Sequence, residues 1–266
     1  GYLILNSFYK RIIMIKKNED NSIKQDKKRA VITSTGDLME FEEHISASGS
    51  AKISGGKINK SLRISGSGAI NGDLECNGLT SNGMIKGSGN LTVHGDISSS
   101  GSFNIAGFLV GDGEADFSGS TEIGNVINIQ GSLIVSGNFK AGHFVRGDQG
   151  INFSGSSEIN GNLSSEKKIS IDGTTSIEGN IIAENIFFGI SREKIKKQHY
   201  KIQGSILAKK NIDIIKTHVD GDIKGKDVAI GQGSEILGNI YYVNSIQIDK
   251  KAKLVNEPTQ IDLGEL

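Results

Sequence analysis

The chain alternates aliphatic and polar residues over very short stretches, and small residues interrupt the alternation again and again. Ile127-Asn-Ile129 and Ile169-Ser-Ile171 are typical of these stretches. An alternation of period two is the pattern of a strand that buries one of its faces. The interrupting residues are mainly Gly, Asn, Asp and Ser, which favour tight corners. The pattern therefore predicts many short strands joined by corners.

A longer repeat organises these short strands. From Ile45 onward, one unit recurs: an aliphatic residue, any residue, glycine, a small polar residue and a second aliphatic residue. Copies of this unit begin at Ile70, Val93, Ile129, Ile159, Ile177, Ile202, Val219 and Ile236. Several neighbouring copies lie about 17–18 residues apart, and two nearly identical segments, 117–125 and 153–161, are separated by two such steps. A fixed period of this kind is the signature of a solenoid.

The length of the repeat indicates how the strands are arranged. Three short strands and three corners fit into one repeat and form one turn of a triangular coil. Each turn then pairs with the next through parallel hydrogen bonds, at about 4.8 Å per turn. The aliphatic side chains point inward and form a continuous core. We therefore predict an all-β fold, a three-sided parallel β-helix with about 17–18 residues per turn, and expect about eleven turns in all.

The rhythm of the repeat divides the chain into segments. Residues 1–44 precede it, and we predict that they form a flexible segment. The first part of the β-helix covers residues 45–190. The step from Ile177 to Ile202 is longer than the step from Ile202 to Val219, and its excess coincides with the basic stretch SREKIKKQ. This predicts a basic insertion at 191–201, which is either a docking patch or a solvated loop. The second part of the β-helix covers 202–256, and a tail covers 257–266.

The first residues of the chain are apolar and basic. No run of about 18 apolar residues occurs in the sequence, so we expect no membrane-spanning helix. A basic amphipathic segment can instead lie on an anionic membrane surface. Candidate membrane contacts are Leu3, Ile4, Leu5, Phe8, Lys10, Arg11, Ile12 and Ile13. The alternative is that the residues before Met14 are a translated leader, with Met14 as the natural start.

Composition narrows the classes of partner. The 30 basic and 30 acidic residues cancel, so no global field attracts the chain to nucleic acid. Cys76 is the only cysteine, which rules out an intrachain disulfide and suits a reducing compartment. Acidic residues are concentrated between positions 96 and 163, and basic residues between 192 and 226. Such complementary stretches can guide association, although accidental clustering on a solvated surface is the simpler interpretation.

The sequence contains no recognisable catalytic or metal-binding motif. The five histidines share no metal-ligand spacing with one another or with Cys76. There is no phosphate-binding P-loop, no GxSxG nucleophile elbow and no calcium-binding nonapeptide repeat. We therefore predict a protein that is not an enzyme and has no cofactor, metal or nucleotide.

A β-helix without an active site offers its surface and its two ends for function. Each end exposes unpaired backbone groups and a slice of apolar core, which must be capped or used for association. The sequence shows no capping helix at either end, so both ends are expected to be open. The predicted polymer interface consists of Ile45 and Ile53 at one end, and of Tyr241, Tyr242, Val243, Ile246, Ile248 and Leu254 at the other.

The ladder of glycine-punctuated units, from about Ile45 to Asn256, resembles the bactofilins, a family of bacterial polymer-forming cytoskeletal proteins. The resemblance implies a right-handed β-helix that assembles into non-polar filaments without nucleotide, usually in the cytoplasm. It also implies a short N-terminal segment that contacts the inner membrane surface, and envelope-remodelling proteins as partners. The chain departs from the family in its single proline, Pro258, and in its basic insertion.

Two other functions fit parts of the pattern. Hexapeptide-repeat acyltransferases have a left-handed β-helix with a turn of similar length, but they favour strict six-residue steps and a catalytic histidine. Surface β-helices that bind or cleave polysaccharide usually have a signal peptide and aromatic platforms, whereas this chain has no tryptophan and five tyrosines. The leading hypothesis is a structural protein that assembles with itself, end to end, into filaments or a scaffold that serves cell shape or envelope organisation.

Overall fold

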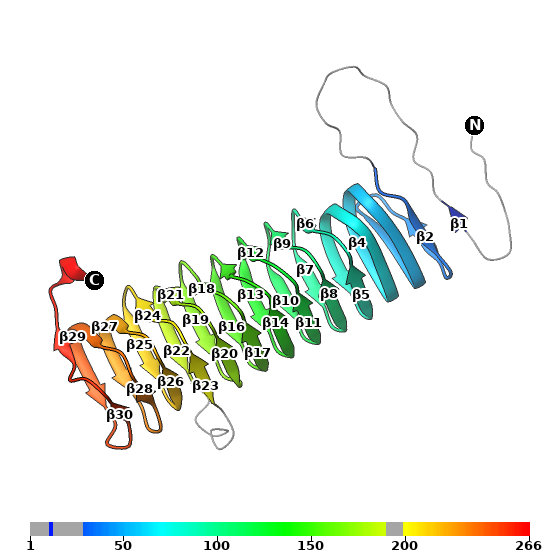
Figure 1. The fold of residues 1–266 in the computed structure, drawn as a ribbon. Helices are drawn as coiled ribbons and strands as arrows, with labels where there is room; N and C mark the ends of the chain where they lie inside the picture. The colour runs from blue at the N-terminus through cyan, green and yellow to red at the C-terminus, as the bar shows by residue number, and fades with distance from the viewer. Residues whose placement is uncertain (1–10, 13–28, 190–198) are drawn as a thin grey trace. The chain divides into compact units, whose positions relative to one another are not determined.

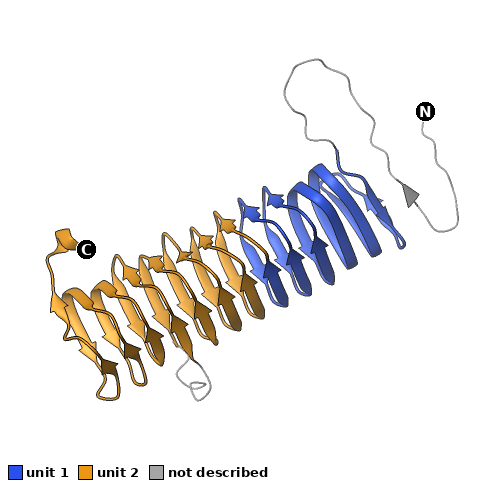
Figure 2. Ribbon diagram, in the orientation of Figure 1, with its two compact units in different colours: residues 1–123 blue, residues 124–266 orange. Residues whose placement is uncertain are grey.

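The protein is all-β, as the repeat predicts. A computed structural model describes residues 11–12, 29–189 and 199–266. The chain divides into two compact units, residues 1–123 and 124–266 (Figure 2). Parallel strands stack as a β-solenoid of about ten turns in all, close to the expected number, and helix makes up about 1% of the chain. One short 3-10 helix, Leu263–Glu265, lies near the C-terminus.

Unit 1 contains strands β1 to β11 (Figure 1). Their bounds are β1 Arg11–Ile12, β2 Ile32–Ser34, β3 Leu38–Glu40, β4 His44–Ser81, β5 Met84–Gly87, β6 Leu91–Val93, β7 Ile97–Ser99, β8 Ser102–Ile105, β9 Leu109–Gly111, β10 Ala115–Phe117 and β11 Ser120–Ile123. Strand β4 is 38 residues long because it continues through its corners without a break.

The pairing within unit 1 shows three strands per turn. Strand β5 pairs with β8, β6 with β9, and β7 with β10, all in parallel. Leu91 is in register with Leu109, one repeat later, and with Leu74, one repeat earlier. The predicted three-sided turn of about 17–18 residues is therefore confirmed in this unit.

Unit 2 contains strands β12 to β31 and follows the same rule. Their bounds are β12 Ile127–Ile129, β13 Ser132–Val135, β14 Asn138–Ala141, β15 Val145–Gly147, β16 Gly150–Phe153, β17 Ser156–Ile159, β18 Leu163–Ser164, β19 Lys168–Ile171, β20 Thr175–Ile177, β21 Ile181–Ala183, β22 Asn185–Phe188, β23 Tyr200–Ile202, β24 Ile206–Ala208, β25 Asn211–Ile214, β26 Thr217–Val219, β27 Ile223–Ile230, β28 Glu235–Ile236, β29 Ile240–Ile248, β30 Lys253–Leu254 and β31 Thr259–Gln260.

The irregular step in the repeat lies between β21 and β24. Ile181 is in register with Ile206, and Ile206 is in register with Ile223, so the first of these two steps is the longer one by eight positions. The stack therefore absorbs the extra residues in one turn without losing its pairing. Strand β23 begins at Tyr200, inside the range predicted for the basic insertion, and residues 190–198 lie outside the described part of the chain.

The core is a stack of inward-facing aliphatic and aromatic side chains. Many strands have buried side chains at their first and third positions and a half-buried side chain at the second, as in β12 and β26. Burying one such aliphatic side chain completely contributes about 1.5–3 kcal/mol. Aromatic rings also pack against each other inside the core: the tilted rings of Phe139 and Phe153 have centroids 5.1 Å apart. This repeated burial explains why the fold tolerates such short strands.

Glycine occupies one corner column because successive turns approach closely there. In Gly204, Gly221 and Gly238 a Cβ atom would collide with the backbone of the glycine one turn earlier. These three residues are not among the glycines with positive φ. Tolerance of positive φ therefore does not explain glycine in this column. Close packing between turns, and not backbone conformation, requires glycine at these positions.

The N-terminal end of unit 1 is closed by strands that run backward. Strands β2 and β3 both pair with β4 in antiparallel fashion, so that Ile32 lies opposite Ile53, and Leu38 opposite Ala47. Residues 29–40 thus cover the first turn, although the predicted boundary at residue 45 places them outside the β-helix. The expectation that this end exposes its whole first turn is wrong, because two reversed strands cover that turn where the sequence shows no capping helix.

Candidate functional site: the C-terminal end of unit 2

The last turn of unit 2 leaves its inward-facing side chains uncovered. Strand β29 places Ile246 opposite Val228 and Ile248 opposite Ile230. Val228 is 3% exposed and Ile230 is 1% exposed, whereas Ile248 is 42% exposed and Ile246 is half-buried. The two turns have the same inward pattern, but within the described residues no further turn covers the second one. The C-terminal end therefore presents a cross-section of the core.

The same end also presents an open backbone edge. Among the described strands, β30 pairs only with β28, and the Asn244–Ile248 part of β29 pairs only with β27. Strand β31 covers a short part of the edge, at Tyr241 and Tyr242. The Gln260 side-chain amide extends this cover by donating a 2.9 Å hydrogen bond to the Val243 carbonyl. Unpaired strand edges are templates for pairing with another chain.

The structure gathers most of the predicted C-terminal interface residues in this turn. Tyr242, Val243, Ile246 and Leu254 are half-buried there, and Ile248 is exposed. The sequence analysis missed Val255, which is 67% exposed directly after β30. The signal was available, because Val255 is an apolar residue at the outward position that follows the inward Leu254.

Tyr241 belongs to a different surface. It lies in register with Lys224, at an outward position of the strand, and lines a groove on the side of unit 2. The prediction that Tyr241 joins the end interface thus places it on the wrong face of its strand, because a one-residue shift moves a side chain to the other side of a sheet.

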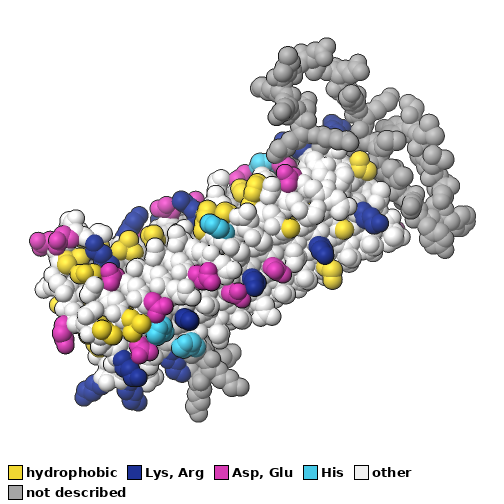
Figure 3. Space-filling model, in the orientation of Figure 1, with side chains coloured by type: hydrophobic (Ala, Val, Ile, Leu, Met, Phe, Trp, Pro, Cys, Tyr) yellow, Lys and Arg dark blue, Asp and Glu magenta, His cyan; other side chains and the backbone are white. Residues whose placement is uncertain are grey.

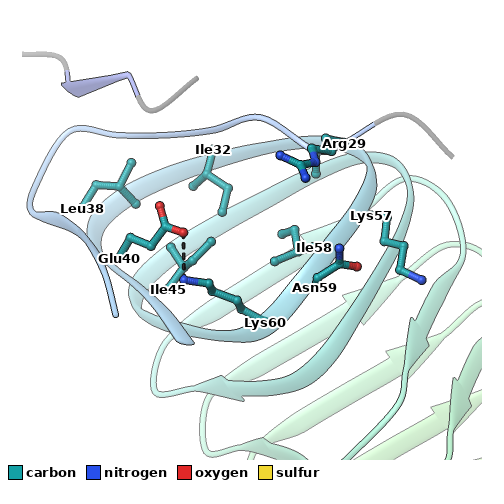
Figure 4. Close-up of a pocket in the computed structure, with 10 residues that line it drawn as sticks. Arg29, Ile32, Leu38, Glu40, Ile45, Lys57, Ile58, Asn59 and Lys60 are labelled. Atoms are coloured by element: carbon teal, nitrogen blue, oxygen red, sulfur yellow. Dashed lines mark ion pairs between the residues drawn. The ribbon is translucent and has the colours of Figure 1, made fainter. Parts of the chain in front are cut away.

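The predicted interface residues of unit 1 are covered. Ile53 is fully buried under β2, and Ile45 is 6% exposed. Ile45 does line an opening of about 180 Å³ at this end, together with Ile32, Leu38 and Ile58 (Figure 4). The Lys60 ammonium and the Glu40 carboxylate form a 2.9 Å ion pair at its rim. This end is therefore a small apolar opening and not an exposed turn.

The candidate membrane contacts fall almost entirely outside the described residues. Arg11 and Ile12 form β1, which pairs in antiparallel fashion with Ser34 and Thr33 of β2. The others lie outside the part of the chain that the structure describes: Leu3, Ile4, Leu5, Phe8, Lys10 and Ile13.

A ladder of polar side chains holds one corner of unit 2 together. Asn180 donates its backbone N–H to Asn162 Oδ1, and Ser205 donates its backbone N–H to Asn180 Oδ1, both at 2.8 Å. The ladder continues as Asp222 N–H donates to Ser205 Oγ at 3.0 Å and Asn239 N–H donates to Asp222 Oδ1 at 2.7 Å. These residues are the small polar residues that follow glycine in the repeat. Their role in the stack is the structural reason for the repeated motif.

The charged clusters within each unit are largely paired internally. In unit 1, His94 bonds to Asp112 through Nδ1 at 2.8 Å and to Glu75 through Nε2 at 3.1 Å, and Glu75 also pairs with Lys57 at 2.8 Å. Hydrogen bonds to the carboxylates of Asp112 and Glu75 raise the pKa of His94, and the bond to Asp112 has the larger effect. The adjacent Cys76 is buried, and desolvation raises its pKa to about 12. This thiol is therefore unreactive in the folded chain.

Unit 2 has equivalent pairs on its surface. The Lys210 ammonium lies 2.8 Å from a Glu184 oxygen, and this hydrogen bond lowers the pKa of Glu184. Arg146 pairs with Asp148 and with Glu166, at 2.5 and 3.0 Å, and the hydrogen bond to Asp148 raises the Arg146 pKa. The Lys210–Glu184 and Arg146–Glu166 pairs link neighbouring turns, and they favour a structural role for the clustered charges.

Among the described residues, no group of three or more His, Cys, Asp and Glu side chains could hold a metal ion. The described part of the chain also contains no helix with the length and hydrophobicity needed to cross a membrane. No protein-family model matches the sequence, and no curated protein shows significant similarity to it.

Proposed function

We propose that the protein is a non-enzymatic structural protein that assembles with itself through the C-terminal end of unit 2. The observation that carries the proposal is the exposure of the final turn. Ile248 is 42% exposed at a position that is 1% exposed one turn earlier. An apolar core cross-section beside an open strand edge is the surface that a second β-solenoid would cover.

The energetics favour a contact that combines apolar burial with strand pairing. Covering one large aliphatic side chain completely contributes about 1.5–3 kcal/mol. Association costs about 4–15 kcal/mol in lost translational and rotational freedom. Several side chains and the edge hydrogen bonds must therefore act together. A single charge placed in this small surface should be enough to prevent association.

Growth beyond a pair requires a second contact. The N-terminal end of unit 1 offers the small apolar opening at Leu38 and Ile45, together with the outer edge of β3, which no described strand pairs. We infer that this end contributes the weaker contact and that filaments lengthen at higher concentration. Assembly would need no nucleotide, as the resemblance to bactofilins implies.

The cellular setting of the proposal comes from that resemblance. It implies a cytoplasmic scaffold, peripheral on the cytoplasmic membrane, that recruits envelope-remodelling proteins. The N-terminal candidate contacts would supply the membrane attachment. These partners and this location are part of the proposal and have their own test, which is sedimentation of the chain with and without residues 1–13 on vesicles of anionic phospholipid.

Negative-stain electron microscopy without nucleotide or metal tests the assembly itself. We expect filaments or sheets from the native chain and folded monomers from Ile248→Lys. The matched control is Ile182→Lys, because Ile182 is 40% exposed on the side of unit 2 and receives the same change. Far-ultraviolet circular dichroism and sedimentation establish the fold and the size of each variant.

The outcomes separate three arrangements. Filaments that persist in Ile248→Lys would show that the end assignment is wrong. Dispersal by Ile182→Lys, with Ile248→Lys still assembled, would show that association is lateral. Discrete trimers of the native chain would instead favour the acyltransferase alternative, and binding of coenzyme A would then be measured.

A further inference from the structure

A groove runs along one side of unit 2, away from the terminal cross-section. It has a volume of about 460 Å³ and is formed by two columns of residues from successive turns. Exposed hydrophobic and charged side chains lie close together on the face of unit 2 drawn in Figure 3. The groove is not accounted for by the proposed assembly, which uses the end of the unit.

The first column of the groove has three apolar or aromatic residues and one lysine at positions that face outward. Ile182 is in register with Leu207, Leu207 with Lys224, and Lys224 with Tyr241. Ile182 is 40% exposed, and Leu207 and Tyr241 are half-buried. Core packing does not require these residues, because the inward positions beside them, such as Ile206, are filled and fully buried.

Earlier turns of the same column show what this position usually holds. Asn128, Arg146 and Ser164 are in register in the preceding turns, and all three are polar or charged. Ser164 is in register with Ile182, and Ile182 with Leu207, so the next two residues of the column are aliphatic. The apolar floor is therefore a local feature of the groove.

The second column supplies polar groups that are only partly used. Asn180, Ser205 and Asp222 each accept one backbone hydrogen bond from the next turn, through Oδ1, Oγ and Oδ1 respectively. Within the described residues, the Asn180 amide nitrogen and the second oxygen of Asp222 make no hydrogen bond in the ladder. An apolar floor beside a row of hydrogen-bonding groups is the usual composition of a ligand site.

The charge of the groove favours an anionic ligand. Lys224 lies in the floor between Leu207 and Tyr241, and it forms no ion pair within the described residues. Two further lysines lie near the groove without lining it: Lys209, which directly follows β24 and is 3.9 Å from Glu166, and Lys226, two residues beyond Lys224 in β27. Among the described residues, Asp222 is the only carboxylate that lines the groove, and it accepts hydrogen bonds from the backbone and side-chain nitrogens of Asn239. A ligand carboxylate would therefore meet a lysine with no partner in the described residues.

We propose that the groove binds a linear polysaccharide that carries carboxylate groups. This proposal rests on the groove alone, and it does not use the cytoplasmic location that the resemblance to bactofilins implies. Pyranose rings have apolar faces that pack on aliphatic and aromatic side chains, and hydroxyl groups that match the polar column. Lys224 would pair with a carboxylate of the chain. Both columns repeat once per turn, at about 4.8 Å, and the length of one pyranose unit in an extended β-1,4-linked chain is close to this spacing.

The same spacing argues against a peptide ligand. Side chains on one face of an extended peptide recur about every 6.6–6.8 Å. They fall out of step with columns that repeat at about 4.8 Å, so a peptide could use only one or two turns of the groove. A polysaccharide lying along the columns would place about one sugar unit at each turn.

Titration calorimetry with a β-1,4-linked mannuronate hexasaccharide tests the proposal on the full chain. We expect binding that Lys224→Glu weakens at least about tenfold, and Leu207→Asp similarly. The matched control is Lys201→Glu, an identical charge reversal at an exposed outward position of β23, which should change the affinity less than about twofold. Cellohexaose, which is neutral, should bind more weakly than the mannuronate.

Three results would overturn the proposal: no binding of the mannuronate, equal loss in Lys224→Glu and Lys201→Glu, or equal binding of hexaglutamate. The last would show that the surface recognises charge alone. The titration is repeated in Ile248→Lys, which should bind normally, and Lys224→Glu should still assemble. Failure of the end interface and failure of the groove are thereby distinguishable.

Discussion

The N-terminal end of unit 1 and the C-terminal end of unit 2 solve the same problem in opposite ways. Each is the place where a stack of parallel turns stops, with an apolar interior and an unpaired edge. In unit 1 the chain covers the first turn with two reversed strands, β2 and β3, and Ile53 beneath them is fully buried. In unit 2 the chain leaves the last turn bare, and Ile248 is 42% exposed.

The difference teaches that capping does not require a helix. Antiparallel strands satisfy the edge of a parallel stack, and their side chains close its interior. Ile32 and Leu38 of the cap are 6% and 4% exposed. Strand β31 does the same for only two residues of the last turn, Tyr241 and Tyr242. The incomplete cover at one end is the feature on which the proposed assembly rests.

The comparison is tested most strongly by making the same truncation at both ends. Ile53→Ala removes a fully buried side chain, and we expect it to lower the free energy of unfolding by about 2–5 kcal/mol. Ile248→Ala removes an exposed side chain, and the loss should be less than about 1 kcal/mol. Urea-induced unfolding, at a concentration where the chain is dispersed, measures both values.

Similar losses in the two variants would contradict this view of the ends. A large loss in Ile248→Ala would mean that the last turn is covered in solution. A small loss in Ile53→Ala would mean that β2 and β3 detach from the first turn. Assembly should respond in the reverse order, with Ile248→Ala weakening it and Ile53→Ala leaving it intact.

The rate at which a reagent labels the Cys76 thiol reports the opening of unit 1 alone, and we expect a smaller effect there than on the free energy of unfolding. It is the only cysteine, it is 0% exposed, and burial raises its pKa to about 12. A thiol reagent should therefore react only when unit 1 opens. We expect Ile53→Ala to speed labelling at least about tenfold, and Ile248→Ala to change it less than about twofold. Rapid labelling of the native chain would show that Cys76 is accessible without such opening.

Most of the fold could be predicted from the sequence because the repeat is local and periodic. The register between turns, the three strands per turn and the alternating core all follow from the spacing of aliphatic residues and glycines. The interruption was also detectable, because the step from Ile177 to Ile202 exceeds the step from Ile202 to Val219 by eight positions. The period of the sequence identifies the equivalent residues of successive turns, and the stacking of those residues defines a solenoid fold.

The ends and the groove could not be predicted in the same way. The cap in unit 1 consists of two three-residue strands outside the repeat, and nothing in residues 32–40 shows that they run backward. The groove depends on outward positions, where the sequence signal is a pair of adjacent aliphatic residues, as in Ile181-Ile182 and Ile206-Leu207. Such pairs indicate only that both residues belong to a strand, because a core pattern does not indicate what an exposed apolar residue contacts.

The smallest expected effect concerns His94, which links three turns near the capped end. Asp112 and Glu75 raise its pKa above 6.5, so the protonated form favours the folded state. This contribution is fully present below about pH 6.5, the unfolded value, and is lost as the pH rises through the higher folded-state pKa. The side chain is 42% exposed, so solvent screening keeps the effect below about 1 kcal/mol.

His94→Gln should therefore remove a small loss of stability of unit 1 that sets in as the pH rises above about 6.5. Asp112→Asn should remove most of the same loss, since its hydrogen bond to His94 is the largest cause of the raised pKa. Cys76 labelling in urea at each pH confines the measurement to unit 1. A full pH dependence in His94→Gln would show that another group is responsible. A dependence that does not weaken in high salt would show that the ion pairs with Glu75 and Asp112 are less exposed in solution than in the structure.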